Sequence, residues 1–314
     1  MSKAMRDVWG EKLVELGTRD PRTVVLDGDL ANSTKADKFA NAHPDRFLQM
    51  GIAEQNLIGL AAGLASTGLV PWTSSFTVFF THRALDPIRM LVAQSHANVK
   101  IVGSYSGLLI GAVGKTHLDV QDLAIMRAMP DMIVLAPVDA TELVAMMDWA
   151  QDYDGPVYLR VVRDAVPDLF GPDYRFTPGA VHTLRTGRDV AFVSTGAQTS
   201  RVVAAADRLA STGISANVVH VPSIKPLDTE ALVGAVGDVG LVATVEEHTV
   251  HGGLGGLVAE TLTAAGAAPR IERIGLDDTW GESAGNDFLL EKHGLSAARI
   301  TERVAALVPA RAAG

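Results

Sequence analysis

An acidic side chain at a predicted turn between a strand and a helix is the first candidate for chemistry. The segment Gly51-Ile52-Ala53-Glu54-Gln55-Asn56 follows a short apolar run at 47–50 and precedes an Ala- and Gly-rich helical pattern. Open α/β sheets bind ligands at such turns. An acid in the first helical turn also stabilises the positive end of the helix, and the local sequence alone favours this structural role for Glu54.

Aromatic residues form the second candidate. The segment 74–80 holds three of the nine Phe residues of the chain, at positions 76, 79 and 80. This spacing places the rings on one face of a helix, which is typical of core packing. Flat rings also form stacking walls for heterocyclic ligands. The pattern by itself favours the core.

A polar loop and a strand end provide further candidates. His117 stands in a loop after Gly111 and Gly114, which are too close together for a nucleotide-binding P-loop. The local sequence gives equal support to a ligand contact by His117 and to a solvated loop histidine. Arg160 and Arg163 leave an apolar run, where a guanidinium group is suited to binding an anion, although a surface arginine is the alternative.

Composition restricts the classes of protein to which this chain can belong. Its 314 residues are 47% apolar and 20% charged, which suits about two folded domains and excludes wholesale disorder. The absence of Cys excludes disulfide scaffolds, cysteine nucleophiles and thiolate metal sites. The net charge of −9 argues against nucleic-acid binding through a basic face. Without a secretory leader or an uninterrupted apolar span, we expect a soluble cytoplasmic protein.

Apolar β-branched runs alternate with helical patterns in two series, which predicts two doubly wound α/β domains with mostly parallel sheets. A Pro- and Gly-rich segment at 164–187 predicts a linker, so we place the domains at 1–175 and 176–314. In the first series we expect strands near 23–26, 70–73, 99–102, 132–135 and 157–162, and helices near 4–17, 55–67, 79–96, 120–128 and 139–150. In the second we expect strands near 189–193, 214–220, 241–246 and 270–274, and helices near 199–211, 227–236, 253–265 and 296–308.

Together and in this order, these segments resemble the C-terminal half of a transketolase, most closely the second chain of a split, two-chain transketolase. The resemblance covers nearly the whole chain and is most specific at 26–35, 51–56, 114–117, 245–248 and 273–283. It implies a pyrimidine-binding domain for thiamine diphosphate, followed by a transketolase C-terminal domain that mainly supports assembly. Deoxyxylulose-phosphate synthase and the β subunits of 2-oxo acid dehydrogenases share this architecture.

The resemblance implies cofactor contacts. Glu54 matches the catalytic glutamate that hydrogen-bonds N1′ of the aminopyrimidine and favours its imino tautomer, a case of positioned acid–base catalysis. Phe76 and Phe79 match aromatic residues around the pyrimidine ring, with Phe80 as the alternative to Phe79. Asp29 matches a position near the thiazolium ring.

The resemblance also implies a substrate site. Arg6, Ser33 and Arg163 match positions that hold the substrate phosphate, and His117 matches one that contacts the hydroxyl groups of the donor sugar. We include Tyr105 in this site, since it stands where transketolases have a phosphate-binding His.

Two departures from the transketolase pattern affect the substrate. Tyr105 replaces the cationic His, which indicates a weaker phosphate site or a non-standard substrate. Val113 stands where transketolases usually have an Asp that contacts the 2-hydroxyl group of the sugar. Because Val cannot accept a hydrogen bond, selection of the sugar must differ or be supplied elsewhere. The reaction class therefore follows from the resemblance more firmly than the substrate does.

The resemblance implies that half of the enzyme lies on another chain. In this superfamily a Gly-Asp-Gly…Asn motif holds the Mg²⁺ that bridges the diphosphate. Gly28-Asp29-Leu30 with Asn56 imitates this motif but lacks its second glycine, so we assign no metal ligand to this chain. We expect an N-terminal partner subunit with the full motif to supply the Mg²⁺ ligands, in an α₂β₂ heterotetramer.

The implied activity is transfer of a two-carbon ketol unit from a ketose or ketose phosphate to an aldose, by a transferase that requires its partner. One alternative is a β-type subunit of a 2-oxo acid decarboxylating enzyme, or a deoxyxylulose-phosphate synthase-like enzyme. Another is a catalytically silent structural or regulatory subunit. Pyruvate consumption with lipoyl-domain binding identifies the 2-oxo acid enzyme, and an unchanged activity after Glu54→Ala identifies the silent subunit.

Overall fold

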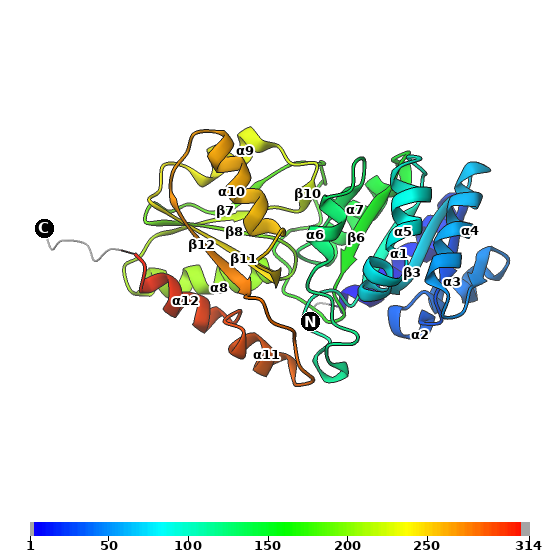
Figure 1. Ribbon diagram of the computed structural model, residues 1–314, viewed down its shortest axis with the longest axis horizontal. Coiled ribbons are helices and arrows are strands. Elements are labelled where there is room, and N and C mark those ends of the chain that lie inside the picture. Colours follow the sequence, from blue (N-terminus) through cyan, green and yellow to red (C-terminus); the bar gives the residue numbers. More distant parts are fainter. Residues whose placement is uncertain (1–2, 309–314) are drawn as a thin grey trace, which may run out of the picture.

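Two β-sheets, each covered by helices, organise residues 3–308, the part of the chain that this computed structural model describes (Figure 1). Within that part, the first sheet has seven strands and the second has five. The strands of the first sheet are, in spatial order, β10 (Ser223–Lys225), β5 (Ile133–Leu135), β6 (Val157–Val161), β4 (Lys100–Ser104), β3 (Val70–Phe76), β1 (Thr23–Asp27) and β2 (Phe47–Gln49). Those of the second are β12 (Arg270–Leu276), β11 (Leu241–Thr249), β8 (Val190–Ser194), β9 (Ala216–His220) and β7 (His182–Arg185).

The strands pair in parallel, except where β10 joins β5 and where β7 joins β9. The helices of the first unit are α1 (Met5–Arg19), α2 (Ala31–Thr34), α3 (Asp37–Ala42), α4 (Glu54–Ser66), α5 (Leu85–Pro87), α6 (Asp122–Arg127) and α7 (Ala140–Asp152). Those of the second are α8 (Gln198–Ser211), α9 (Thr229–Val236), α10 (Leu254–Ala264), α11 (Asn286–Lys292) and α12 (Ala297–Ala305). In residues 3–308, none of the helices has the length and apolar character needed to cross a membrane.

Both faces of the first sheet are buried, as successive residues of β1 illustrate. Val24 and Leu26 pack in a core with residues of α4 and α6, whereas Val25 packs in the core beneath α1 and α7. Successive side chains of a strand point to opposite faces, so an uninterrupted apolar run is stable where helices cover both. The predicted architecture of two α/β domains with mostly parallel sheets is therefore confirmed.

The helix predicted over 79–96 is not a regular α-helix. π-Helical turns at Phe79–Arg83 and Ile88–Ala93 flank the short α5. Pro87 has no N–H group to continue the α-helical hydrogen bonds, which the apolar periodicity did not reveal. The prediction that Phe76 shares a helical face with the two following Phe residues is also wrong, because Phe76 ends β3.

The two units are connected more closely than the predicted linker indicates. Residues 164–187 include β7, which begins at His182 and forms an edge of the second sheet. The unpredicted β10 crosses back from the second unit and pairs with β5 of the first sheet. A division of the chain after residue 175 stays a proposal, because the first sheet takes a strand from beyond it.

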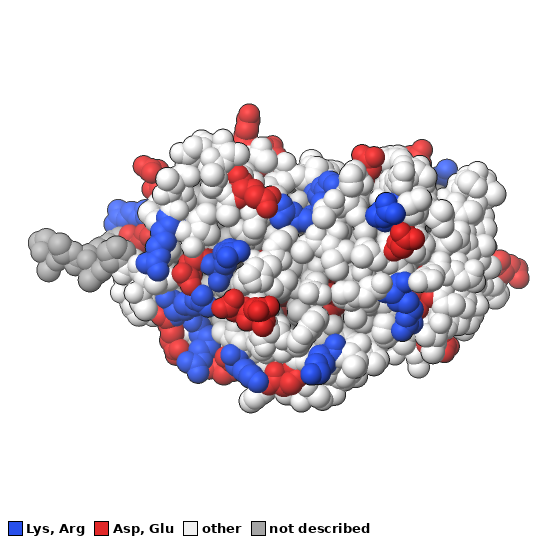
Figure 2. All heavy atoms as spheres, viewed as in Figure 1, with Lys and Arg blue, Asp and Glu red and all other residues white. Residues whose placement is uncertain are grey.

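The surface carries both signs of charge. Figure 2 shows Lys and Arg side chains interspersed with Asp and Glu over the visible face, most densely around α11 and α12. Several of these charges are paired, as in the ion pairs of Arg299 with Glu291 and of Arg303 with Glu272. On this face the described residues form no continuous basic surface, which agrees with the acidic composition.

A buried polar cluster joins the two units. The carboxylate of Glu142 on α7 accepts hydrogen bonds from the Tyr174 hydroxyl group (2.6 Å) and the Val138 amide (2.7 Å). Its Oε2 atom also lies 2.9 Å from Nε2 of His220 on β9. Burial acts to raise the pKa of Glu142, but the charge of His220 and these hydrogen bonds outweigh it and hold the pKa below its usual value.

Replacing Glu142 by Gln is expected to lower the free energy of unfolding by about 1–3 kcal/mol at pH 7, because one of the two acceptor oxygens becomes an NH2 donor and leaves a buried partner without its acceptor. Since the folded-state pKa is the lower one, the stabilisation is present above the unfolded pKa of about 4.5 and is lost as the pH falls through the folded pKa. Urea denaturation across pH measures this, with Glu230→Gln on the exposed side of α9 as the control. Equal stability of Glu142→Gln and the natural chain at pH 7 would contradict it.

Candidate active site

The predicted site residues lie along one edge of the first sheet. Because its strands β1, β2, β3, β4 and β6 are parallel, their carboxyl ends meet at the same edge. The residues at or just after these ends are Asp29 and Ser33 after β1, Glu54 after β2, Phe76 and Phe79 at β3, Tyr105 after β4 and Arg163 after β6. Arg6 joins them from the first turn of α1, whose Met5 amide bonds the carbonyl of Asp164 (3.2 Å). Residues separated by up to 157 positions in the sequence thus share one edge.

Glu54 is fully buried at the first position of α4. Its Oε1 atom accepts a hydrogen bond from the Ser75 hydroxyl group (3.0 Å), and its Oε2 atom pairs with Nη1 of Arg83 (2.6 Å). An acid that caps a helix accepts hydrogen bonds from the backbone amides of the first helical turn. Among the described residues, the partners of Glu54 are instead the side chains of Ser75 and Arg83. The carboxylate is therefore held in one orientation, and the purely helix-stabilising interpretation does not account for its contacts.

A set of aromatic rings adjoins this acid. The rings of Phe76 and Phe79 lie 6.0 Å apart and nearly parallel, at 17°. The imidazole of His117 meets the ring of Phe79 edge-on at 5.5 Å, and the Arg83 guanidinium lies 4.5 Å from the centre of that ring. Phe80, by contrast, is fully buried in the core, whereas Phe79 packs beneath Arg83, the ion-pair partner of the acid. These flat apolar surfaces suit a planar heterocycle.

Two arginines with free donors form the other end of the cluster. Arg6 donates from Nη1 to the Tyr105 hydroxyl group (2.5 Å) and to the backbone carbonyl of Ser33 (3.2 Å). The Nε atoms of Arg6 and Arg163 are both buried without a hydrogen-bond partner among the described residues. Both guanidinium groups lie within 6 Å of the Tyr105 ring, at 5.9 and 5.8 Å. Two guanidinium groups that adjoin the same ring and have unpaired N–H groups are suited to an anion.

Tyr105 orients this arginine pair. Its hydroxyl group accepts a hydrogen bond from Arg6 and donates its single proton to the carbonyl of Ser33 (2.9 Å). The hydroxyl group therefore has no donor left for a ligand. The Ser33 hydroxyl group faces Asn32 Oδ1 (3.3 Å). Tyr105 also has a positive φ of 60°, a conformation that costs a Tyr residue about 1–3 kcal/mol and that the surrounding contacts must maintain.

The sequence did not single out two charged residues of this edge. Arg83 follows Phe79 by four residues, a spacing that could have indicated its partnership with that ring. Asp27 is fully buried, and its Oδ1 atom accepts from the Leu30 amide (2.7 Å) while Oδ2 has no partner among the described residues. Burial raises the pKa of Asp27. The predicted Asp29 is instead exposed, with its amide bonded to Gln49 Oε1 (3.0 Å).

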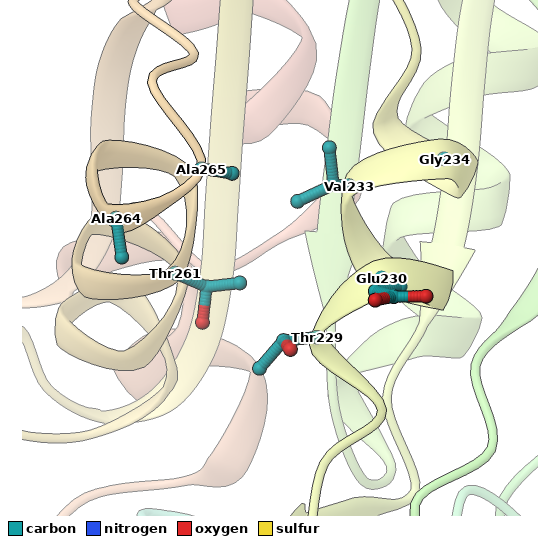
Figure 3. Close-up of a pocket in the computed structure, with 7 residues that line it drawn as sticks. All are labelled: Thr229, Glu230, Val233, Gly234, Thr261, Ala264 and Ala265. Carbon is teal, nitrogen blue, oxygen red and sulfur yellow. The ribbon is translucent and has the colours of Figure 1, made fainter.

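A groove in the second unit has fewer side chains suited to catalysis or to binding a cofactor. It lies between α9 and α10 of the second unit and is lined by Thr229, Glu230, Val233, Gly234, Thr261, Ala264 and Ala265 (Figure 3). Its lining contains no aromatic ring and no cation. Among residues 3–308, no group of three or more His, Cys, Asp or Glu side chains is placed to hold a metal ion. The sheet edge is therefore the candidate active site.

Two family matches cover most of the chain. Residues 1–168 match the family described as Transketolase, pyrimidine binding domain. Residues 179–300 match the family described as Transketolase, C-terminal domain. The candidate site lies in the part that matches the first of these descriptions.

Individual proteins show the same likeness over nearly their whole length. The chain is 39% identical to a 6-deoxy-6-sulfo-D-fructose transketolase subunit of Clostridium sp., covering 94% of this chain and 92% of that one. It is 38% identical to an apulose-4-phosphate transketolase subunit of Actinobacillus succinogenes, covering 92% and 93%. A solved structure described as a split-gene transketolase, inactive β4 tetramer, matches with a TM-score of 0.88 and 43% identity over 98% of each chain.

The arginine pair predicts that the chain binds inorganic phosphate. Replacing Arg163 by Met is expected to raise the phosphate Kd about tenfold or more, because a charge-assisted hydrogen bond contributes about 1.5–3 kcal/mol. Titration calorimetry at low ionic strength measures this, since salt screens the interaction. Arg185→Met, at an arginine whose side chain is 50% exposed, is the matched control. Equal phosphate affinity of Arg163→Met and the control would contradict the assignment.

Proposed function

The chain belongs to the transketolase family of transferases, and on that premise we propose that it is one subunit of a two-chain transketolase that depends on thiamine diphosphate. The proposed reaction moves a two-carbon ketol unit from a ketose or ketose phosphate to an aldose. The observation that carries this proposal is the juxtaposition of a buried acid, flat aromatic rings and an arginine pair at one sheet edge.

The residues present fit the aminopyrimidine part of the cofactor. A heterocycle with a basic ring nitrogen requires an acid at its edge and apolar surfaces at its faces. Glu54 provides the buried carboxyl group, and Phe76 and Phe79 provide nearly parallel rings beside it. When bound, thiamine diphosphate supplies the electron sink that permits cleavage of the carbon–carbon bond next to the ketose carbonyl.

In this proposal Glu54 acts as the acid–base group of the chain. Its carboxyl group would hydrogen-bond a pyrimidine ring nitrogen of the bound cofactor, and the bonds from Ser75 and Arg83 fix the direction of that group. The Arg83 side chain is 41% exposed, whereas Glu54 is fully buried, so the ion pair reaches the surface only through its guanidinium group. The ring of Phe79 packs beneath the Arg83 guanidinium at 4.5 Å and supports its position.

Arg6 and Arg163 bind the far end of the sugar. Their unpaired Nε–H groups suit a terminal phosphate or sulfonate group, and Tyr105 holds Arg6 in place. The relatives from Clostridium and Actinobacillus are named for sugars with a sulfo and a phosphate group, which supports an anionic substrate here. His117 meets the ring of Phe79 at the aromatic end, and we propose that it contacts sugar hydroxyl groups there.

Selection of the sugar must rest on groups other than Val113. Its side chain is 49% exposed on the loop that precedes His117, and it offers no hydrogen bond. The donor and acceptor are therefore best identified with a panel of ketoses and aldoses. Pyruvate as the preferred donor would instead favour the 2-oxo acid or deoxyxylulose-phosphate synthase-like alternatives.

We further propose that an N-terminal partner subunit completes the site. Its Gly-Asp-Gly…Asn motif would hold Mg²⁺ and the cofactor diphosphate, and two copies of each chain would form an α₂β₂ heterotetramer. The related split-gene structure is described as an inactive β4 tetramer, which supports dependence on another subunit. A cytoplasmic location stays a prediction from the sequence.

Glu54→Ala is expected to lower ketol transfer by the complex of this chain with its partner by about 10²–10⁴-fold, because a positioned acid–base group is lost. A coupled assay that follows aldehyde release from the ketose measures kcat. Glu230→Gln should retain full activity as the control. Unchanged activity of Glu54→Ala would identify a catalytically silent subunit.

The purified chain without its partner is expected to bind thiamine diphosphate weakly and to show no turnover, because the diphosphate and Mg²⁺ lack their ligands. Adding a subunit with the Gly-Asp-Gly…Asn motif should restore both binding and activity. Titration calorimetry and the same assay measure the two effects. Appreciable ketol transfer by the chain alone would contradict the two-chain proposal.

A further inference from the structure

We infer that Asn286, on α11 of the second unit, is a positioning residue for the anion-binding end of the proposed transketolase site. This inference rests on the proposed function. Asn286 lies at the start of α11, partly buried, and its single Nδ2 group donates to Asp164 Oδ2 (2.9 Å) and to the carbonyl of Leu109 (3.2 Å). Both partners belong to the first unit and adjoin residues of the site.

Asp164 connects Asn286 to both arginines. It directly follows Arg163, the arginine at the end of β6. Its backbone carbonyl accepts the amide of Met5 (3.2 Å), the residue before Arg6. A shift of Asp164 therefore moves the backbone of Arg163 directly and that of Arg6 through one hydrogen bond.

Leu109 connects Asn286 to the loop that carries His117. This loop leaves the sheet edge after Tyr105 and is closed at its base by a hydrogen bond from the Gly107 amide to the Asp119 carbonyl (2.8 Å). The second unit satisfies both backbone groups of Leu109. Its carbonyl accepts from Asn286, and its amide donates to the carboxylate of Glu247 on β11 (3.2 Å). Buried backbone groups outside regular structure require such partners.

Further contacts hold the same loop against the segment that precedes α11. The amide of Ala284 donates to the carbonyl of Gly111 (3.2 Å), and the Ser283 hydroxyl group donates to the carbonyl of Ala112 (2.6 Å). A Cβ atom at Gly111 would lie 2.2 Å from the Ala284 carbonyl oxygen and 2.7 Å from Asn286 Oδ1. The two backbones can approach this closely because residue 111 has no side chain.

The second unit therefore does more than support assembly. The side-chain amide of Asn286 connects the arginine pair to the His117 loop, which Ser283, Ala284 and Glu247 also hold. The spacing between the arginine pair and this loop determines whether a sugar chain can reach both ends of the site at once. A residue that sets it should affect anionic substrates more than neutral ones, since the arginines contact only the anion.

The test compares Asn286→Ala with the natural chain, each assembled with its partner subunit. Asn286→Ala removes both hydrogen bonds without adding charge. The KM for a ketose phosphate is expected to rise about tenfold, while the KM for the same ketose without phosphate changes less than twofold. Asp287→Ala, at an exposed neighbour on α11, is the matched control and should change neither KM. Asn286→Ser, whose hydroxyl group is too short to reach both partners, should show the same split if Asn286→Ala fails to fold.

Several results would overturn the inference. An equal rise of both KM values, an unchanged KM for the phosphorylated ketose, or a loss of activity explained by a lower Tm would show a merely structural residue. If the natural complex has no preference for the phosphorylated ketose, the assignment of the anion site itself is wrong. Absence of any ketol transfer by the natural complex would refute the proposed function, a result that is distinguishable because it involves no variant.

Discussion

Parallel pairing of the strands in the first sheet is the constraint on which the rest of the site depends. Because β1, β2, β3, β4 and β6 run in one direction, every turn that follows them lies at one edge. Side chains that are far apart in the sequence are therefore brought together at this edge. Helices on both faces bury the strands, which makes the edge the place where polar groups can remain accessible.

Residues at this edge have unusual local structure. Tyr105 and Asp29 have positive φ angles of 60° and 68°, which few non-glycine residues adopt. Glu54 is a fully buried acid that two side chains from another segment satisfy. Such features cost free energy and persist where the surrounding structure over-determines them. In our account they orient groups toward ligands, and the second unit contributes by bonding to the loop between Tyr105 and His117.

The sequence predicted the architecture well and local geometry less well. Apolar runs such as 157–162 gave the inner strands, because both of their faces are buried. The π-helical turns around Pro87 and the returning strand β10 were missed, since periodicity does not report how a distant segment pairs. The short strand β10 has three residues and no apolar pattern of its own.

Within the site, the sequence indicated the residues but not their partners. Ring positions at 76, 79 and 80 could not show that Phe80 enters the core while Phe79 lies beneath Arg83. The role of Tyr105 in holding Arg6 depends on a contact across 99 residues. The roles that the resemblance gave to Glu54, Arg163 and the other site residues stay proposals, which these contacts support.

The most direct measurement is a structure of this chain bound to its partner subunit and thiamine diphosphate. Our account predicts that a pyrimidine ring nitrogen lies within hydrogen-bond distance of a Glu54 carboxylate oxygen, with the ring beside Phe79 and the diphosphate on the partner subunit. A cofactor bound with its pyrimidine ring away from this sheet edge, or held entirely by one chain, would contradict it.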